Sequence, residues 1–139
     1  MNSFFYCDID SDGTPEICGE VYAPDNYNEE YVNLTDANSY LLIFDTSLSL
    51  KYPVETNYGA SSNVYAIPFN NKVVSLWLGR TEYNHKYILK LYNDKDGLLT
   101  NIERDVSSLF KSIPQILVAK NNNTDLIYLI GNNQVIQFD

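Results

Sequence analysis

The side chains with the clearest chemical potential lie near the N-terminus, where three aspartates alternate with other residues and a glutamate follows. A tight loop can turn alternate side chains inward, and carboxylates held that close repel one another unless a cation lies between them. Oxygen ligands, with no His or Cys inside the loop, suit a hard cation such as Ca²⁺. We therefore expect a calcium site whose ligands are Asp8, Asp10, Asp12, the backbone carbonyl of Thr14, and Glu16.

The residues around these ligands indicate a loop between two strands. Gly13 permits a sharp turn, because glycine reaches positive φ without a Cβ clash. An EF-hand loop would need a bidentate Glu at its twelfth position, which is Gly19 here. The flanking segments, Ser3–Cys7 and Ile17–Tyr22, are aromatic and β-branched, which predicts strands rather than helices. An acidic surface turn that binds no ion is the alternative for the same residues.

A metal loop that closes a β-hairpin resembles the FG-GAP/VCBS repeat of integrin-like β-propellers. In that family the pattern Asp-x-Asp-x-Asp-Gly-x-x-(Asp/Glu), followed by apolar residues, ties two strands of a blade around calcium. Asp8, Asp10, Asp12, Gly13 and Glu16 match this pattern position by position, over about ten residues. The resemblance implies an extracellular adhesion or ligand-binding module, or a non-catalytic part of a polysaccharide-processing protein.

The two cysteines, Cys7 and Cys18, flank the acidic loop. A hairpin could place them nearly opposite each other, and a disulfide would then close the loop in an oxidising compartment. Two small buried residues of a β core are the other interpretation. Cross-strand geometry decides between the two, and the spacing leaves both open.

Internal similarity predicts three copies of one four-stranded pattern, over residues 1–56, 57–105 and 106–139. Each copy reads as consecutive strands joined by turns, which is the anatomy of a propeller blade, although the third copy lacks its fourth strand. After the opening hairpin, the predicted strands are Tyr40–Asp45, Ser47–Tyr52, Val64–Phe69, Val73–Leu78, Tyr87–Tyr92, Leu98–Ile102, Ile116–Ala119, Leu126–Ile130 and Val135–Asp139.

Few segments outside these strands favour another structure or chemistry. Asp105–Ile113 is the sole helical candidate, ended by Pro114. Asp94 and Asp96 before Gly97 are half of a metal pattern, but turn chemistry explains them better. We therefore expect an all-β fold of two to three four-stranded antiparallel β-propeller blades, partial or a fragment, with few or no helices.

Composition narrows the classes of function. The chain has 139 residues, 45% of them hydrophobic and 12 of them Tyr, enough for one domain with a real core. Its net charge of −9 argues against a nucleic-acid or anionic-membrane surface. No apolar run approaches the length that spans a bilayer. The chain has one histidine, His85, no Gly-rich phosphate loop and no nucleophile elbow, so we expect no enzyme.

These observations predict a calcium-binding, non-catalytic binding or adhesion module in which Ca²⁺ braces a hairpin loop. The alternatives are a non-catalytic propeller part of a polysaccharide-processing enzyme, or a purely architectural scaffold. The family resemblance and the loop favour an extracellular, cell-surface or periplasmic location, although the segment shows no signal peptide. A protein or carbohydrate is the expected ligand. Two or three blades leave edge strands open, so the remainder of a longer parent chain or another copy should cover them.

Overall fold

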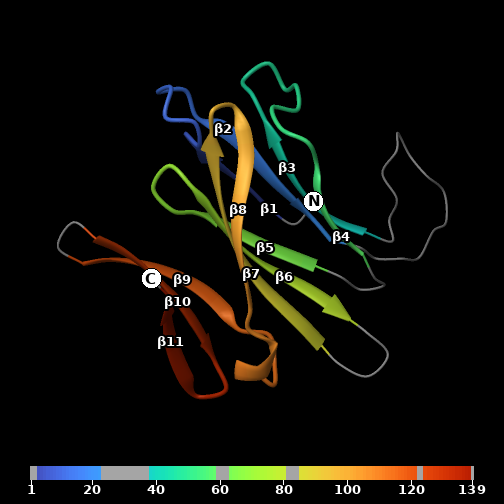
Figure 1. The fold of residues 1–139 in the computed structure, drawn as a ribbon, viewed down its shortest axis with the longest axis vertical. Coiled ribbons are helices and arrows are strands. Elements are labelled where there is room, and N and C mark those ends of the chain that lie inside the picture. Colours follow the sequence, from blue (N-terminus) through green and yellow to red (C-terminus); the bar gives the residue numbers. More distant parts are fainter. Residues whose placement is uncertain (1–2, 23–37, 59–62, 81–84, 122–123, 139) are drawn as a thin grey trace.

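A computed structural model describes residues 3–22, 38–58, 63–80, 85–121 and 124–138 of the chain. Within these residues the protein is all-β, and its strands form three antiparallel sheets (Figure 1). The first sheet contains β1 (Ser3–Cys7), β2 (Glu16–Val21), β3 (Asn38–Phe44) and β4 (Glu55–Tyr58). The second contains β5 (Asn63–Pro68), β6 (Val73–Arg80), β7 (His85–Lys95) and β8 (Leu98–Asp105). The third contains β9 (Gln115–Asn121), β10 (Thr124–Gly131) and β11 (Gln134–Phe138).

Each sheet is a meander in which strands that follow one another in the chain are neighbours. The turn chemistry favours this arrangement. Asp96 and Gly97 both have positive φ (56° and 81°), as a two-residue type I′ hairpin requires, and the Gly97 amide donates to Asp94 Oδ1. Asn132 and Asn133 repeat that conformation between β10 and β11, with φ of 50° and 59°. The prediction that the Asp94–Gly97 region is an ordinary turn is confirmed.

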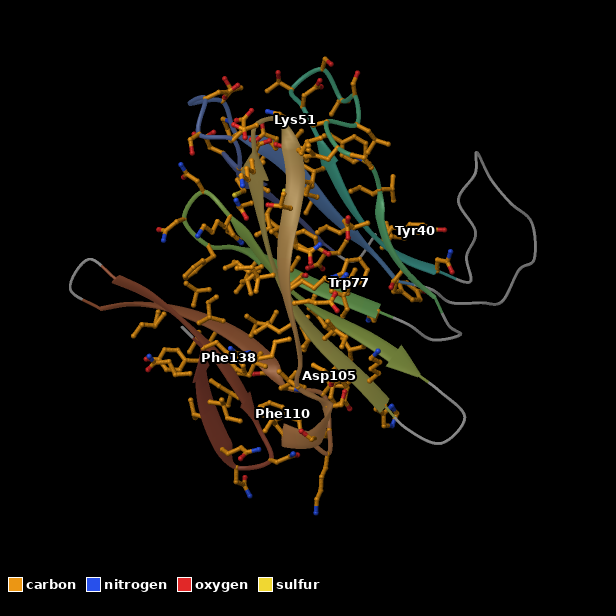
Figure 2. The ribbon with its side chains drawn as sticks, in the orientation of Figure 1. Tyr40, Lys51, Trp77, Asp105, Phe110 and Phe138 are labelled. Atoms are coloured by element: carbon orange, nitrogen blue, oxygen red, sulfur yellow. The ribbon has the colours of Figure 1, made fainter. Side chains whose placement is uncertain are left out.

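The second sheet lies between the other two, as Figure 1 shows, and it is buried on both faces. Side chains alternate along β6, so that Val73 and Trp77 pack toward the first sheet while Leu76 and Leu78 pack toward the third. Trp77 is 2% exposed, which confirms that it belongs to the core (Figure 2). The continuous apolar run of β6 is therefore explained by burial on both sides.

The predicted strands of the second and third copies coincide with β5 to β11, apart from a few residues at their ends. Asp139, predicted as part of the last strand, lies outside the described residues. The third sheet has three strands among the described residues, so a fourth strand is lacking there as predicted. The helical candidate forms a single 3₁₀ turn, η1 (Ser107–Leu109). Among the described residues, no helix is both long and apolar enough to cross a membrane.

The fourth strand of the first sheet was predicted at Ser47–Tyr52, and that prediction is wrong. The chain turns back at Asp45, whose Oδ1 accepts hydrogen bonds from the amides of Ser47 and Ser49 at 2.9 and 3.0 Å. Only the isolated bridge between Phe44 and Leu50 remains of strand pairing there. Pairing resumes at β4, so the predicted boundary between residues 56 and 57 falls inside that strand. The cause is the aspartate side chain, which competes with the sheet for backbone amides.

Candidate functional site

The acidic loop joins β1 to β2 at one end of the first sheet. Cys7, the last residue of β1, pairs with Glu16, the first residue of β2, so the hairpin holds both ends of the loop together. The carboxylates of Asp8, Asp10 and Glu16 each offer an oxygen within 4.8 Å of the others. Glu16 is only 2% exposed, whereas Asp8 and Asp10 are half-buried. The strand pairing thus assembles a compact anionic cluster in which Glu16 is the most buried carboxylate.

The loop folds around its own carboxylates. Four of its backbone amides donate to acidic side chains: Gly13 N to Asp8 Oδ2 (3.1 Å), Asp12 N to Asp10 Oδ1 (3.2 Å), Thr14 N to Asp12 Oδ1 (2.7 Å) and Ile9 N to Glu16 Oε2 (2.9 Å). Ser11 and Gly13 have positive φ, 61° and 88°, and no atom lies within 4 Å of where a Gly13 Cβ would stand. Gly13 is therefore required for its backbone conformation rather than for space.

Lys51 supplies a positive charge to this cluster from a distant part of the chain. Its ammonium donates to Asp10 Oδ2 at 2.5 Å and to Glu16 Oε1 at 2.6 Å. The Lys51 amide donates to the Ile43 carbonyl at 2.9 Å, which fixes the backbone beside β3. Figure 2 shows Lys51 at the loop end of the first sheet. Because Glu16 is buried, loss of the ammonium would leave its carboxylate without a cation, and such a loss is costly.

The ion pair between Lys51 and Asp10 shifts the pKa of both residues. The hydrogen bond from Lys51 holds the pKa of Asp10 below its usual value. Partial burial opposes the charge on Lys51, but the hydrogen bonds to Asp10 and Glu16 outweigh it and raise the pKa of Lys51. Asp10 and Lys51 are consequently both charged at neutral pH.

The structure brings together three of the five predicted ligands, namely Asp8, Asp10 and Glu16. Asp12 is exposed, and its carboxylate accepts the Thr14 amide within its own turn. Thr14 is exposed as well, and its described hydrogen bond uses the amide rather than the predicted carbonyl. The cluster thus contains fewer of the ligands than the pattern predicts, and it contains a lysine that the pattern does not include.

The donor set fits a hard divalent cation by chemistry and by charge. Asp8 Oδ1 is buried and has no hydrogen-bond partner among the described residues, so one oxygen of the cluster remains available. Three carboxylates and one ammonium leave a formal charge of −3 + 1 = −2, counted over Asp8, Asp10, Glu16 and Lys51. A metal bound here would have to share Asp10 and Glu16 with Lys51 or displace its ammonium.

The sequence gives only a faint signal for Lys51. The residue lies 35 positions after Glu16 and 41 after Asp10, so no local spacing connects it to the loop. The pairing of β2 with β3, with Ile17 opposite Phe44, returns the chain to the loop end of the sheet. A lysine shortly after that strand is a usable signal once the strand order is known.

The two cysteines lie beneath the loop as free, buried thiols. Cys18 pairs with Phe5 and Cys7 with Glu16, so the cysteines are diagonal rather than directly opposite. The Cys7 thiol donates to the Lys72 carbonyl at 3.3 Å. Burial, reinforced by the nearby Glu16, raises the pKa of Cys7 to about 11, and burial with Cys7 nearby raises that of Cys18 to about 12. The structure therefore agrees with the buried-residue interpretation.

Two contacts connect the site to the second sheet. Asn71, in the turn between β5 and β6, donates from Nδ2 to Ser11 Oγ at 2.6 Å. Tyr52, one residue after Lys51, donates from its hydroxyl to Asp94 Oδ2 at 2.9 Å. Burial and the hydrogen bond to Asp94 raise the pKa of Tyr52, so the phenol keeps its proton. The loop therefore lies where the first two sheets meet.

Comparison of the chain with protein-family models, with curated proteins and with solved structures finds no match.

Proposed function

We propose that the protein is a non-catalytic binding or adhesion module built of propeller-like blades, in which Ca²⁺ braces the loop between β1 and β2. One observation carries the proposal: the carboxylates of Asp8, Asp10 and Glu16 lie within 4.8 Å of one another, and Asp8 Oδ1 is buried without a hydrogen-bond partner among the described residues. The all-β meanders and the resemblance of the loop to FG-GAP/VCBS repeats support the blade-type architecture.

Calcium would have a structural role in this proposal. Carboxylates at such separations repel one another, and the single ammonium of Lys51 leaves the cluster with an excess of negative charge. A divalent cation removes that excess and fixes a loop that contacts the second sheet through Ser11. Extracellular calcium modules bind with a Kd of about 10⁻⁴–10⁻³ M. An extracellular, cell-surface or periplasmic setting with millimolar calcium is accordingly part of the proposal.

A second candidate is a purely architectural scaffold in which Lys51 is the permanent cation of the loop. The observation that favours it is the pair of short contacts, 2.5 and 2.6 Å, from the Lys51 ammonium to Asp10 and Glu16. These contacts brace the loop with a charge that belongs to the chain. The scaffold would then be equally stable with and without calcium, whereas the calcium module would not.

Thermal unfolding in EDTA and in 10 mM CaCl₂ separates the two candidates. With a Kd of about 10⁻⁴–10⁻³ M, that calcium concentration stabilises the protein by about 1.4–2.7 kcal/mol, which raises its Tm by several degrees. The informative variant is Asp8→Asn, because Asp8 belongs to the cluster but makes no ion pair with Lys51. It should lose most of the calcium-dependent rise, and its melting temperature in EDTA should be equal to or above that of the wild type, because one of the repelling charges is removed.

Asp45→Asn is the matched control, because Asp45 also receives backbone amides in a loop at the same end of the sheet but lies outside the cluster. Its calcium-dependent rise should equal that of the wild type. Identical wild-type melts in the two buffers would rule out the calcium module and leave the scaffold. A glycan array and a panel of extracellular protein domains then search for the ligand of the module.

A further inference from the structure

The first and third sheets each bury one face against the second sheet and turn the other face outward. Strand alternation and cross-strand register identify the two outward faces. The outward face of the first sheet carries Phe4, Tyr6, Ile17 and Phe44, which are partly or largely exposed, and Gly19 and Leu42, which are buried among them. The outward face of the third sheet carries Leu117, Ala119, Leu126, Tyr128, Ile130 and Val135, together with the polar Gln137. Neither set contains a charged residue, although the chain carries a net charge of −9.

The outward face of the first sheet is hollowed as well as apolar. A groove of about 350 Å³ lies over Gly19, between Phe4 and Tyr6 on one side and Phe44 and Leu48 on the other. Phe4 and Tyr6 are 63% and 59% exposed although they belong to a strand. On the third sheet, Leu117 and Val135 are 48% and 62% exposed. Apolar surface of this kind on a sheet face marks an interaction site.

We propose that these two faces bind each other between copies of the chain, so that the first sheet of one copy packs head-to-tail on the third sheet of the next. The argument is continuity with the two contacts inside the chain. There the second sheet meets the first through the face of Val73 and Trp77, and it meets the third through the opposite face of Leu76 and Leu78. When the third sheet of one copy packs on the first sheet of the next copy, the stack of sheets continues in the same order from copy to copy.

The same continuity distinguishes this contact from a symmetric dimer. Inside the chain the second sheet meets two different sheets through its two opposite faces, and no sheet meets a copy of itself. A contact between two first sheets or between two third sheets would have no counterpart inside the molecule. A head-to-tail contact is heterologous, so it either closes a ring of copies or continues as an open series.

Electrostatics adds an independent expectation. Two copies of net charge −9 repel each other at long range, while the uncharged faces gain from burial. Salt screens the repulsion and leaves the burial intact. The association should therefore strengthen when NaCl is raised from 50 to 500 mM, which is the opposite of an interface held by ion pairs. The inference needs no calcium, so it can fail or succeed separately from the proposed function.

Sedimentation velocity of the 139-residue chain from 1 to 100 µM, in EDTA and in calcium, tests the proposal. The expected result is a species heavier than the 15.9 kDa monomer. Tyr6→Lys disrupts only the first-sheet face, and Val135→Lys disrupts only the third-sheet face; both side chains are exposed, so both variants should fold. Leu98→Lys is the matched control, because Leu98 is 69% exposed beside the β7–β8 turn and belongs to neither face.

Head-to-tail packing predicts that each face variant alone is monomeric and that an equimolar mixture of the two associates again. The mixture keeps one intact contact, between the first sheet of Val135→Lys and the third sheet of Tyr6→Lys. Loss of association in only one of the variants would indicate a same-face dimer and would overturn the proposal. A wild type that stays monomeric at 100 µM in 500 mM NaCl would overturn it as well. Far-ultraviolet circular dichroism of each variant verifies that it is folded.

Discussion

Replacement of Lys51 by methionine tests whether the chain provides the cation of its own acidic loop. Methionine keeps an apolar stem of similar length and removes the ammonium that contacts Asp10 and Glu16 at 2.5 and 2.6 Å. Glu16, 2% exposed, would then lose its cationic partner. The substitution therefore isolates the electrostatic contribution of Lys51 from its packing.

The expected magnitude lies between two limits. Removing one partner of a fully buried ion pair costs about 3–5 kcal/mol, whereas an exposed pair is worth about 0–1 kcal/mol. Glu16 is buried, but Lys51 and Asp10 are 22% and 20% exposed, so solvent screens part of the interaction. We expect a loss of about 2–3 kcal/mol in EDTA, which for a chain of this length lowers the Tm by roughly 6–12 °C.

Calcium should act more strongly on Lys51→Met than on the wild type, because the ion no longer competes with an ammonium for Asp10 and Glu16. Lys90→Met is the control. Lys90 is as buried as Lys51, 19% exposed, but its carboxylate partners Glu103 and Glu55 are 3.6 and 4.0 Å away. The control should lose about 1 kcal/mol or less and show the calcium response of the wild type. A Lys51→Met melt within 1 °C of the wild type in EDTA would refute the reasoning.

Three further predictions follow from burial and titration. The stability difference between the wild type and Lys51→Met should stay constant at intermediate pH. This difference should shrink above about pH 10.4, because the lysine of the unfolded chain loses its proton there while the raised pKa in the folded protein retains it. The difference should also shrink below about pH 3.9, as Asp10 protonates through its lowered pKa in the folded protein. Denaturant titrations at a series of pH values measure both limbs, and a difference independent of pH would contradict the ion pair. The thiols of Cys7 and Cys18 should resist Ellman's reagent at pH 8 until urea unfolds the chain, because burial raises both pKa values; rapid labelling of the native protein would contradict this. Trp77→Ala should cost about 3–5 kcal/mol by circular dichroism in urea, and a loss below 1 kcal/mol would mean that Trp77 is not the core side chain that its 2% exposure indicates.

Much of the fold follows from local sequence. The runs of apolar and β-branched residues, with the Asp-Gly and Asn-Asn turns, predict the hairpins of the second and third sheets, because strand propensity and positive-φ turn residues both act over a few residues. The acidic loop is likewise local. Its aspartates, Gly13 and Glu16 lie within one hairpin, so the sequence alone determines that carboxylates crowd at its tip.

Tertiary structure decided the features that depend on residues far apart in the chain. Lys51 reaches Asp10 and Glu16 only because β3 pairs with β2 and returns the chain to the loop. The Asp45 turn displaced the fourth strand to Glu55–Tyr58, since a side chain captured the amides that a strand would have used. Burial on both faces of β6 and on one face of the outer sheets depends on sheet stacking, which no local pattern encodes. The sequence thus determined where charge accumulates, and the stacking and pairing of sheets decided which cation reaches it and which apolar faces remain outside.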